Sequence, residues 1–160
     1  GTVLWTHIPV ESYGLQVLQL RTLDGRPADA TWINREHFNL VYRLESVISQ
    51  AQEDGKRLIV ISHHAPTMVG TLGDRYVADP KRFYYANNLD RLLTSDQVYV
   101  WIFGHTHVNC DYRSPGDTRV VSNQYQGDYY DAEKVLGVNH KVAPVVPVAD
   151  FRGSGRGPPN

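Results

Sequence analysis

Two pairs of histidines carry the clearest chemical signal in this sequence of 160 residues. The first pair is His63-His64, and the second is His105 and His107, which follow Gly104. Neutral imidazole binds Zn, Fe, Mn and Ni ions, so the pairs predict a metal site. Histidines separated by one residue can splay apart in a turn and contact two ions, and glycine frees the backbone for such a turn. Either member of the first pair could instead be a strand-end residue bonded to a backbone carbonyl.

Each histidine pair follows a segment typical of a buried β-strand. Residues 58–62 and 98–103 are apolar and rich in β-branched or aromatic side chains, which favours strands covered on both faces. Functional residues of α/β sheets gather just beyond the carboxyl ends of the strands. We therefore expect His63 to approach His105 if the two strands are neighbours.

The remaining elements complete an α/β, or α+β layered, fold with a partly parallel sheet. Residues 31–54 predict a helix that ends at Gly55 in a left-handed cap, with Asn34 on its solvated face. Strands are expected at residues 3–8 and 119–122, a short helix at 86–93 and a turn at 114–117. The apolar stripe of the long helix comprises Ile33, Phe38, Val41, Leu44, Val47, Ile48 and Ala51.

The other histidines and the cysteine have simpler explanations. We expect His7 to be packed beside the site, and His37 and His140 to be solvated. Cys110 does not complete a zinc-finger spacing, and we expect it to be buried and inert. A lone cysteine excludes an internal disulfide framework and suits a reducing compartment, so we expect a cytoplasmic protein.

Composition narrows the class of protein further. The chain is 41% hydrophobic and 21% charged, which suits a globular domain and excludes a wholly disordered or collagen-like chain. A formal net charge of −1 provides no field that would recruit nucleic acid or an anionic membrane. No apolar run approaches the roughly 20 residues that span a bilayer. We expect one domain over residues 1–150 and a flexible Gly/Pro-rich tail over residues 151–160.

The sequence Ser-His-His-Ala-Pro at residues 62–66, followed by Gly-His-Thr-His at 104–107, closely resembles the calcineurin-like metallophosphoesterases. The likeness is to the Ser/Thr protein phosphatase-like branch and covers roughly residues 3–127, including flanks at 4–9 and 120–124. It implies a partial four-layer β-sandwich flanked by helices. It also implies that His63 and His105 bind one metal and His107 the other, with His64 as the alternative to His63.

The resemblance implies a hydrolase of phosphate monoesters or diesters. Members of the family normally hold two Mn, Fe or Zn ions, which lower the pKa of a bridging water so that hydroxide attacks phosphorus. His63, His105 and His107 are then the catalytic and metal-binding residues, and a phosphate ester is the substrate. The motifs do not specify which ester.

The family's earlier motifs are missing from this chain. Asp-x-His is absent, and no Gly-Asp or Gly-Asn-His precedes His63. We therefore expect the C-terminal half of a domain, whose partner is the missing N-terminal half. Three histidines without a bridging carboxylate would hold one ion at most. A non-enzymatic fragment with a structural or vestigial metal site, and a metal-independent phosphoesterase using histidine as general acid and base, are the alternatives.

Residues 74–85 mix cations with aromatic side chains after the first histidine pair. They could form a rim that binds the organic part of a phosphate ester. A solvated surface loop is the simpler interpretation.

Overall fold

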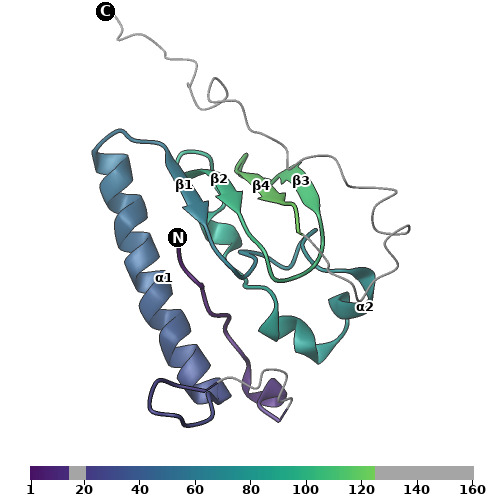
Figure 1. The fold of residues 1–160 in the computed structure, drawn as a ribbon. Coiled ribbons are helices and arrows are strands. Elements are labelled where there is room, and N and C mark those ends of the chain that lie inside the picture. Colours follow the sequence, from purple (N-terminus) through teal and green to yellow (C-terminus); the bar gives the residue numbers. More distant parts are fainter. Residues whose placement is uncertain (15–20, 125–160) are drawn as a thin grey trace, which may run out of the picture.

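The computed structural model describes residues 1–14 and 21–124, so the predictions for His140 and for the 151–160 tail lie outside the described residues. Its main helix is α1 (Ala30–Glu53), and its strands are β1 (Leu58–Ile61), β2 (Val98–Ile102), β3 (Cys110–Arg113) and β4 (Arg119–Ser122). The short helices are α2 (Asp74–Val77) and the 3-10 helices η1 (Val10–Ser12), η2 (Pro80–Tyr84) and η3 (Asp90–Leu92) (Figure 1). Within this described part of the chain, no helix has the length and apolarity needed to cross a membrane.

The four strands form one mixed sheet in the order β1-β2-β4-β3. β1 pairs parallel with β2, and β2 pairs parallel with β4, whereas β3 pairs antiparallel with β4. The expected mixture of helix with a partly parallel sheet is therefore confirmed. The parallel pairing places the carboxyl ends of β1 and β2 side by side at the same end of the sheet.

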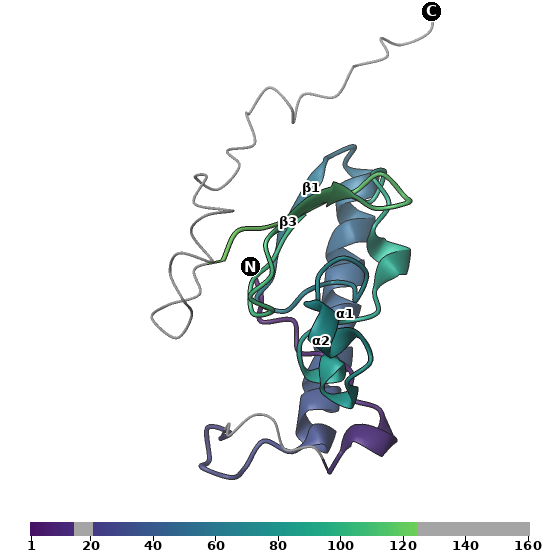
Figure 2. The ribbon, with the colours of Figure 1, turned by 90° about the vertical axis from the view of Figure 1, so that its right-hand side faces the viewer.

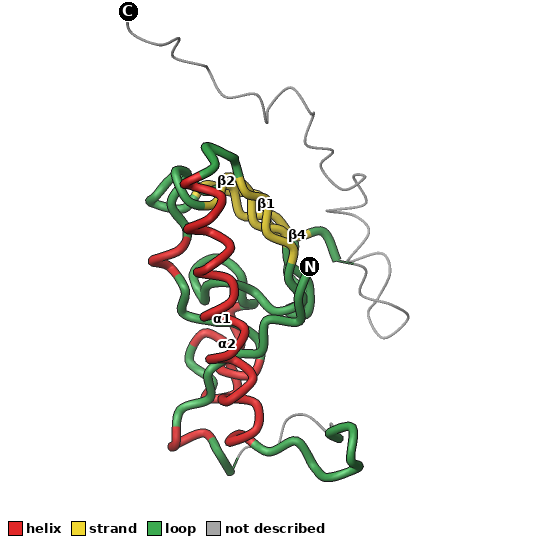
Figure 3. The backbone as a smooth tube through the Cα atoms, turned by 90° about the vertical axis from the view of Figure 1, so that its left-hand side faces the viewer, coloured by secondary structure: helices red, strands yellow, loops and turns green. Residues whose placement is uncertain are grey.

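α1 lies along one face of the sheet (Figures 2 and 3). Val41 and Ile48 of the helix belong to the same buried cluster as Val60, Trp101 and Val120 of the sheet. Trp101 is fully buried, and its indole Nε1–H donates to the Ser62 hydroxyl at 2.9 Å. The core therefore lies between α1 and the sheet.

The predicted ends of the long helix are confirmed. The Asp29 side chain accepts a hydrogen bond from the Trp32 N–H at 2.8 Å, which caps the amino end of α1. At the other end, Gly55 has a φ of 63°, and the Lys56 N–H donates to the Ala51 carbonyl at 2.8 Å. This is the left-handed closure for which glycine is favoured.

The predicted apolar stripe of α1 is wrong at four positions. Two apolar residues assigned to the stripe are exposed, and two polar residues outside it are buried. Phe38 and Val47 are 59% and 52% exposed, whereas Asn34 and His37 are buried. The reason is that the N-terminal segment packs beside the helix and needs hydrogen-bond partners. Asn34 exchanges two hydrogen bonds with the backbone of Ile8, at 2.7 and 2.8 Å. The expectation that His37 is solvated is therefore wrong.

Three other predictions about local structure need correction. Residues 3–8 form no strand, because only Thr2 pairs with the sheet, in a single parallel bridge to Ser62. Residues 86–93 contain only the 3-10 turn η3. The first apolar segment is not covered on both faces, since Ile59 and Ile61 are 43% and 54% exposed. Buried Val60 lies between them, so Ile59 and Ile61 point to the opposite face of the sheet, which the described residues leave partly uncovered. A sequence pattern cannot distinguish this exposure from burial.

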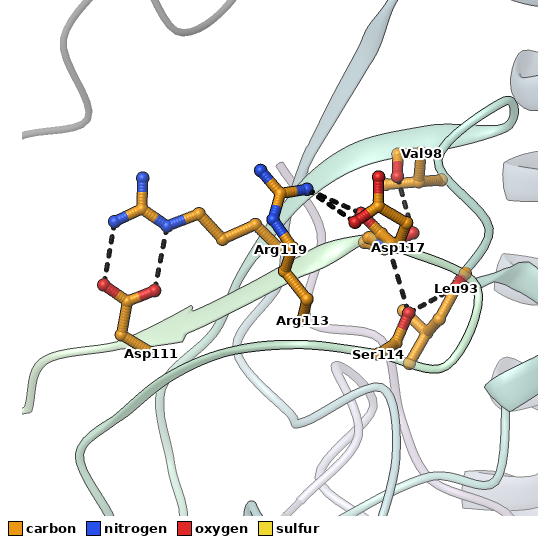
Figure 4. A network of polar contacts seen from close by, with 8 residues as sticks. Leu93, Val98, Asp111, Arg113, Ser114, Asp117 and Arg119 are labelled. Carbon is orange, nitrogen blue, oxygen red and sulfur yellow. Dashed lines mark hydrogen bonds and ion pairs between the residues drawn. The ribbon is translucent and has the colours of Figure 1, made fainter.

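The turn between β3 and β4 is held by polar contacts (Figure 4). Ser114 and Asp117 close the predicted turn through a hydrogen bond from the Asp117 N–H to the Ser114 carbonyl at 2.9 Å. The Arg113 guanidinium donates to the Asp117 carboxylate at 3.1 Å. At the base of the turn, Arg119 of β4 pairs with Arg113 of β3. The Arg119 guanidinium donates two hydrogen bonds to the Asp111 carboxylate, each at 2.8 Å.

Candidate functional site

Three of the four paired histidines meet at the carboxyl edge of the parallel strands. The ring centroids of His63 and His105 lie 4.7 Å apart, and those of His64 and His105 lie 4.2 Å apart. The two rings of the first pair are 5.1 Å apart. The Gly104 N–H donates to the His63 carbonyl at 3.0 Å, which joins the two strand exits directly. The expectation that His63 approaches His105 is confirmed.

His64 is held in one orientation by the N-terminal segment. Its Nδ1 lies 3.0 Å from the Val3 carbonyl oxygen, which can only accept, so Nδ1 carries the proton. Its Nε2 therefore presents a lone pair. This nitrogen is buried and has no hydrogen-bond partner in the described part of the molecule. A buried polar atom of this kind costs stability unless something binds it.

His105 is oriented in the opposite sense. Its Nε2 lies 3.3 Å from the Tyr84 carbonyl oxygen, so that nitrogen donates and Nδ1 keeps the lone pair. The residue has a φ of 71°, which is uncommon for a non-glycine residue. His107 shares this conformation with a φ of 56°.

The prediction that Gly104 supplies the conformational freedom of the turn is wrong. The left-handed backbone occurs at the two histidines and not at Gly104. A Cβ atom at Gly104 would make only ordinary contacts, at 3.6 and 3.8 Å, with the carbonyl oxygen and Nδ1 of His63. The position of the turn was predicted correctly, but its left-handed residues are His105 and His107.

Burial controls the protonation of two histidines in the cluster. Burial, with the neighbouring His105 as the next cause, lowers the pKa of His64 to about 3. Burial likewise lowers the pKa of His105 to about 4, with His63 as the next cause. Both rings are therefore neutral near pH 7 and can donate lone pairs. Their pKa values are too low for efficient general acid catalysis at that pH.

The side chain of His107, two residues after His105, is exposed. Its backbone N–H donates to the Gln124 side-chain oxygen at 2.9 Å, and the Gln124 amide nitrogen donates to the Val108 carbonyl at 3.1 Å. Gln124 thus bridges the turn from the end of β4, a role that no sequence signal had indicated. His107 also acts on the cluster electrostatically, because it is one of the groups that lower the pKa of His105.

Aromatic rings border the cluster on two sides. Trp5 lies 5.4 Å from His64, and Tyr85 lies 5.4 Å from His105, measured between ring centroids. Tyr76 of α2 extends the row, with its ring 5.0 Å from that of Tyr85. The segment of residues 74–85 therefore reaches the histidines with its aromatic side chains. Trp5 was not anticipated as a neighbour of the site.

The donor chemistry of the cluster fits part of a metal site. Neutral imidazole nitrogens suit Zn, Mn or Fe, and the orphaned Nε2 of His64 is available for such an ion. Among residues 1–14 and 21–124, however, no group of three His, Cys, Asp or Glu side chains is arranged to hold a metal ion. The described residues would therefore supply part of a coordination sphere.

Two further sequence candidates, His7 and Cys110, have different surroundings, and the exposure of His7 contradicts the expectation that it is packed. His7 is exposed and contacts Phe38, with 5.5 Å between ring centroids. Cys110 is only partly exposed, and burial raises the pKa of its thiol to about 11. Cys110 therefore remains a protonated thiol at neutral pH, as its expected inertness requires.

Comparison with known proteins gives little that bears on function. No family model matches the chain, and no solved structure matches it. An uncharacterized protein of Acanthamoeba polyphaga mimivirus, L509, is 29% identical over 70 residues, which is 40% of this chain and 25% of the viral protein. The chain thus spans about a quarter of the length of the curated relative it matches.

Proposed function

We propose that this chain supplies histidine ligands to a metal-dependent phosphoester hydrolase of the calcineurin-like type. The observation that carries the proposal is the buried Nε2 of His64, which has no partner among the described residues and lies in a cluster of three imidazoles. The cluster lies at the carboxyl ends of adjacent parallel strands, where α/β proteins place functional groups. The proposal includes the fold of that family, a four-layer β-sandwich to which this chain would contribute a part.

The structure favours His64 over His63 as the ligand from the first pair. The Val3 carbonyl fixes the His64 ring and its tautomer, in the way that carbonyls orient metal-binding histidines. His63 is exposed, so its ring is less constrained. In this arrangement His64 and His105 would be ligands of one ion, and His107 would serve a second ion or the substrate.

The chain's own residues would orient the reaction. The Val3 and Tyr84 carbonyls accept hydrogen bonds from the imidazole N–H groups of His64 and His105, which keeps one lone pair of each ring for coordination. Tyr85 and Tyr76 form the wall along which the organic part of a phosphate ester would lie. A bound metal would polarise phosphoryl oxygens and lower the pKa of a water molecule.

The N-terminal half of the domain is the proposed partner. No group of three donors is arranged for metal binding in the described residues, so carboxylate and further ligands must come from elsewhere. The isolated chain should therefore bind about one ion at most and turn over phosphate esters poorly. The same observation favours a second candidate, a non-enzymatic domain with a structural metal site.

Elemental analysis of metal bound to the purified chain tests the proposal. His64→Asn is the sharpest variant, because its amide nitrogen can replace Nδ1 as donor to Val3 while Nε2 is removed. We expect His64→Asn and His105→Ala to lose the bound Mn or Zn, whereas His7→Gln keeps it. Circular dichroism establishes that each variant is folded.

Activity measurements then separate the two candidates. With p-nitrophenyl phosphate, we expect a longer form of the protein that includes the missing half to show turnover that EDTA and His105→Ala both abolish. Metal binding without turnover in that longer form would favour the structural site. Turnover that resists EDTA would overturn both and support acid–base catalysis.

A further inference from the structure

The outer edge of β1 carries a groove that the described residues leave open. The groove has a volume of about 340 Å³ and lies between β1 and α1. Its lining includes Ile59 and Ile61 from the strand and Leu44 and Val47 from the helix, and among its lining residues Arg43 alone has a charged side chain. Val47, Ile59 and Ile61 are each more than two-fifths exposed.

The N-terminal residues already pair with one end of this edge. The Thr2 N–H donates to the Ile61 carbonyl at 3.1 Å, and the His63 N–H donates to the Thr2 carbonyl at 3.0 Å. Thr2 therefore lies opposite Ser62 in a parallel bridge. Gly1 lies in the groove itself, close against Ile61.

Strand geometry shows which backbone groups remain open. Ser62 donates toward β2, to the Ile102 carbonyl at 2.9 Å, so the alternate residues Ile59 and Ile61 direct their backbone groups toward the outer edge. Of these groups, the Ile61 carbonyl already accepts a hydrogen bond from the Thr2 N–H. In the parallel register set by Thr2, a residue directly before Gly1 would accept from the Ile61 N–H and donate to the Ile59 carbonyl.

We propose that the groove receives polypeptide joined to the amino side of Gly1, as a strand parallel to β1. Its first and third residues before Gly1 would face α1 beside Val60 and would be apolar, since paired residues in a sheet point to the same face. Such a strand extends the sheet to five strands and covers an exposed edge that otherwise invites aggregation. The inference rests on backbone pairing and not on the histidines, so it stands or falls separately from the metal site.

Two chains with designed extensions test the proposal. Each carries six residues before Gly1 in which Val or Ile alternates with Thr, and the two differ only in phase. In one, the apolar residues are first, third and fifth before Gly1, and in the other they are second, fourth and sixth. Amide hydrogen exchange is measured by NMR with EDTA present.

The in-phase extension should slow exchange of the Ile59 and Ile61 amides at least about tenfold relative to the out-of-phase extension. Val47→Lys should remove this protection, whereas Val77→Lys, at an exposed position outside the groove, should not. Equal exchange rates with the two extensions would overturn the proposal. So would protection of Ile59 in the chain that begins at Gly1 if it disappears on dilution, because a second copy would then occupy the groove.

Discussion

The histidine cluster and the β3–β4 turn are two strained regions of one sheet, and they differ in how their polar groups are satisfied. Both contain non-glycine residues with positive φ, His105 at 71° and Asp117 at 69°. At the turn, Arg113 binds both the carbonyl and the carboxylate of Asp117. In the cluster, the buried Nε2 of His64 has no partner in the described residues. The Asp117 backbone is thus accompanied by hydrogen bonds to that same residue, whereas the His105 backbone lies beside an unsatisfied buried nitrogen, the feature from which the metal site is proposed.

Acid should expose this difference most strongly. His64 and His105 have folded-state pKa values of about 3 and about 4, against an ordinary 6.5. Below pH 6.5 the unfolded chain therefore binds more protons at these two histidines than the folded chain does. Their contribution to the free energy of unfolding is fully present above pH 6.5 and falls as the pH decreases. Each residue should cost on the order of 2 kcal/mol of unfolding free energy between pH 7 and pH 5. Urea titrations monitored by tryptophan fluorescence measure the change.

Variants assign that pH dependence to the cluster. His64→Asn should remove about half of the part of the slope that His64 and His105 contribute, while buried His37, whose pKa burial also lowers, keeps its own part. His7→Gln changes an exposed histidine outside the cluster and should leave the slope as it is. An unfolding free energy that stays constant from pH 7 to pH 5 would contradict the buried, neutral state of these rings.

The turn should be more sensitive to added volume than to pH. A Cβ atom at Gly116 would collide with the Leu93 carbonyl and would approach Cγ2 of Thr94 to 2.9 Å. Gly116→Ala should therefore cost on the order of 1–3 kcal/mol in unfolding free energy. Gly14→Ala is the matched control, because no atom of the described residues lies within 4 Å of its added Cβ. Equal stabilities of the two variants, measured by thermal denaturation, would contradict the close packing at Gly116.

The ion pair of the β3–β4 hairpin should have the smallest effect. Arg119 and Asp111 are partly exposed, at 21% and 40% of their side-chain surfaces. Their bidentate geometry should contribute about 0.5–1 kcal/mol of coupling, which salt weakens. A double-mutant cycle with Arg119→Ala and Asp111→Ala, at low and high ionic strength, measures it. A coupling well above this range would place the pair among the main supports of the hairpin.

The sequence predicted the elements that depend on local pattern. The limits of α1, the Gly55 cap and the two parallel strands follow from periodicity, glycine conformation and β-branched composition. The exposure of Ile59 and Ile61 does not, because exposed isoleucines look the same in a sequence as buried ones.

Prediction of the candidate site was limited by contacts between distant residues. The meeting of His63 with His105 followed from strand ends, but the distinct environments of His63 and His64 depend on the Val3 carbonyl. Burial of His37 likewise depends on the Trp5 carbonyl, which lies 32 residues away. No local pattern carries such information.

The N-terminal segment has a consequence for the order of folding. Val3, Leu4 and Trp5 offer consecutive carbonyls to His64, Asn87 and His37, across separations of 61, 83 and 32 residues. Contacts across such separations carry a large loop-closure entropy, so they form after local structure such as the β3–β4 hairpin. We therefore expect the tautomer of His64 to be fixed only when this segment docks, after the local structure has formed.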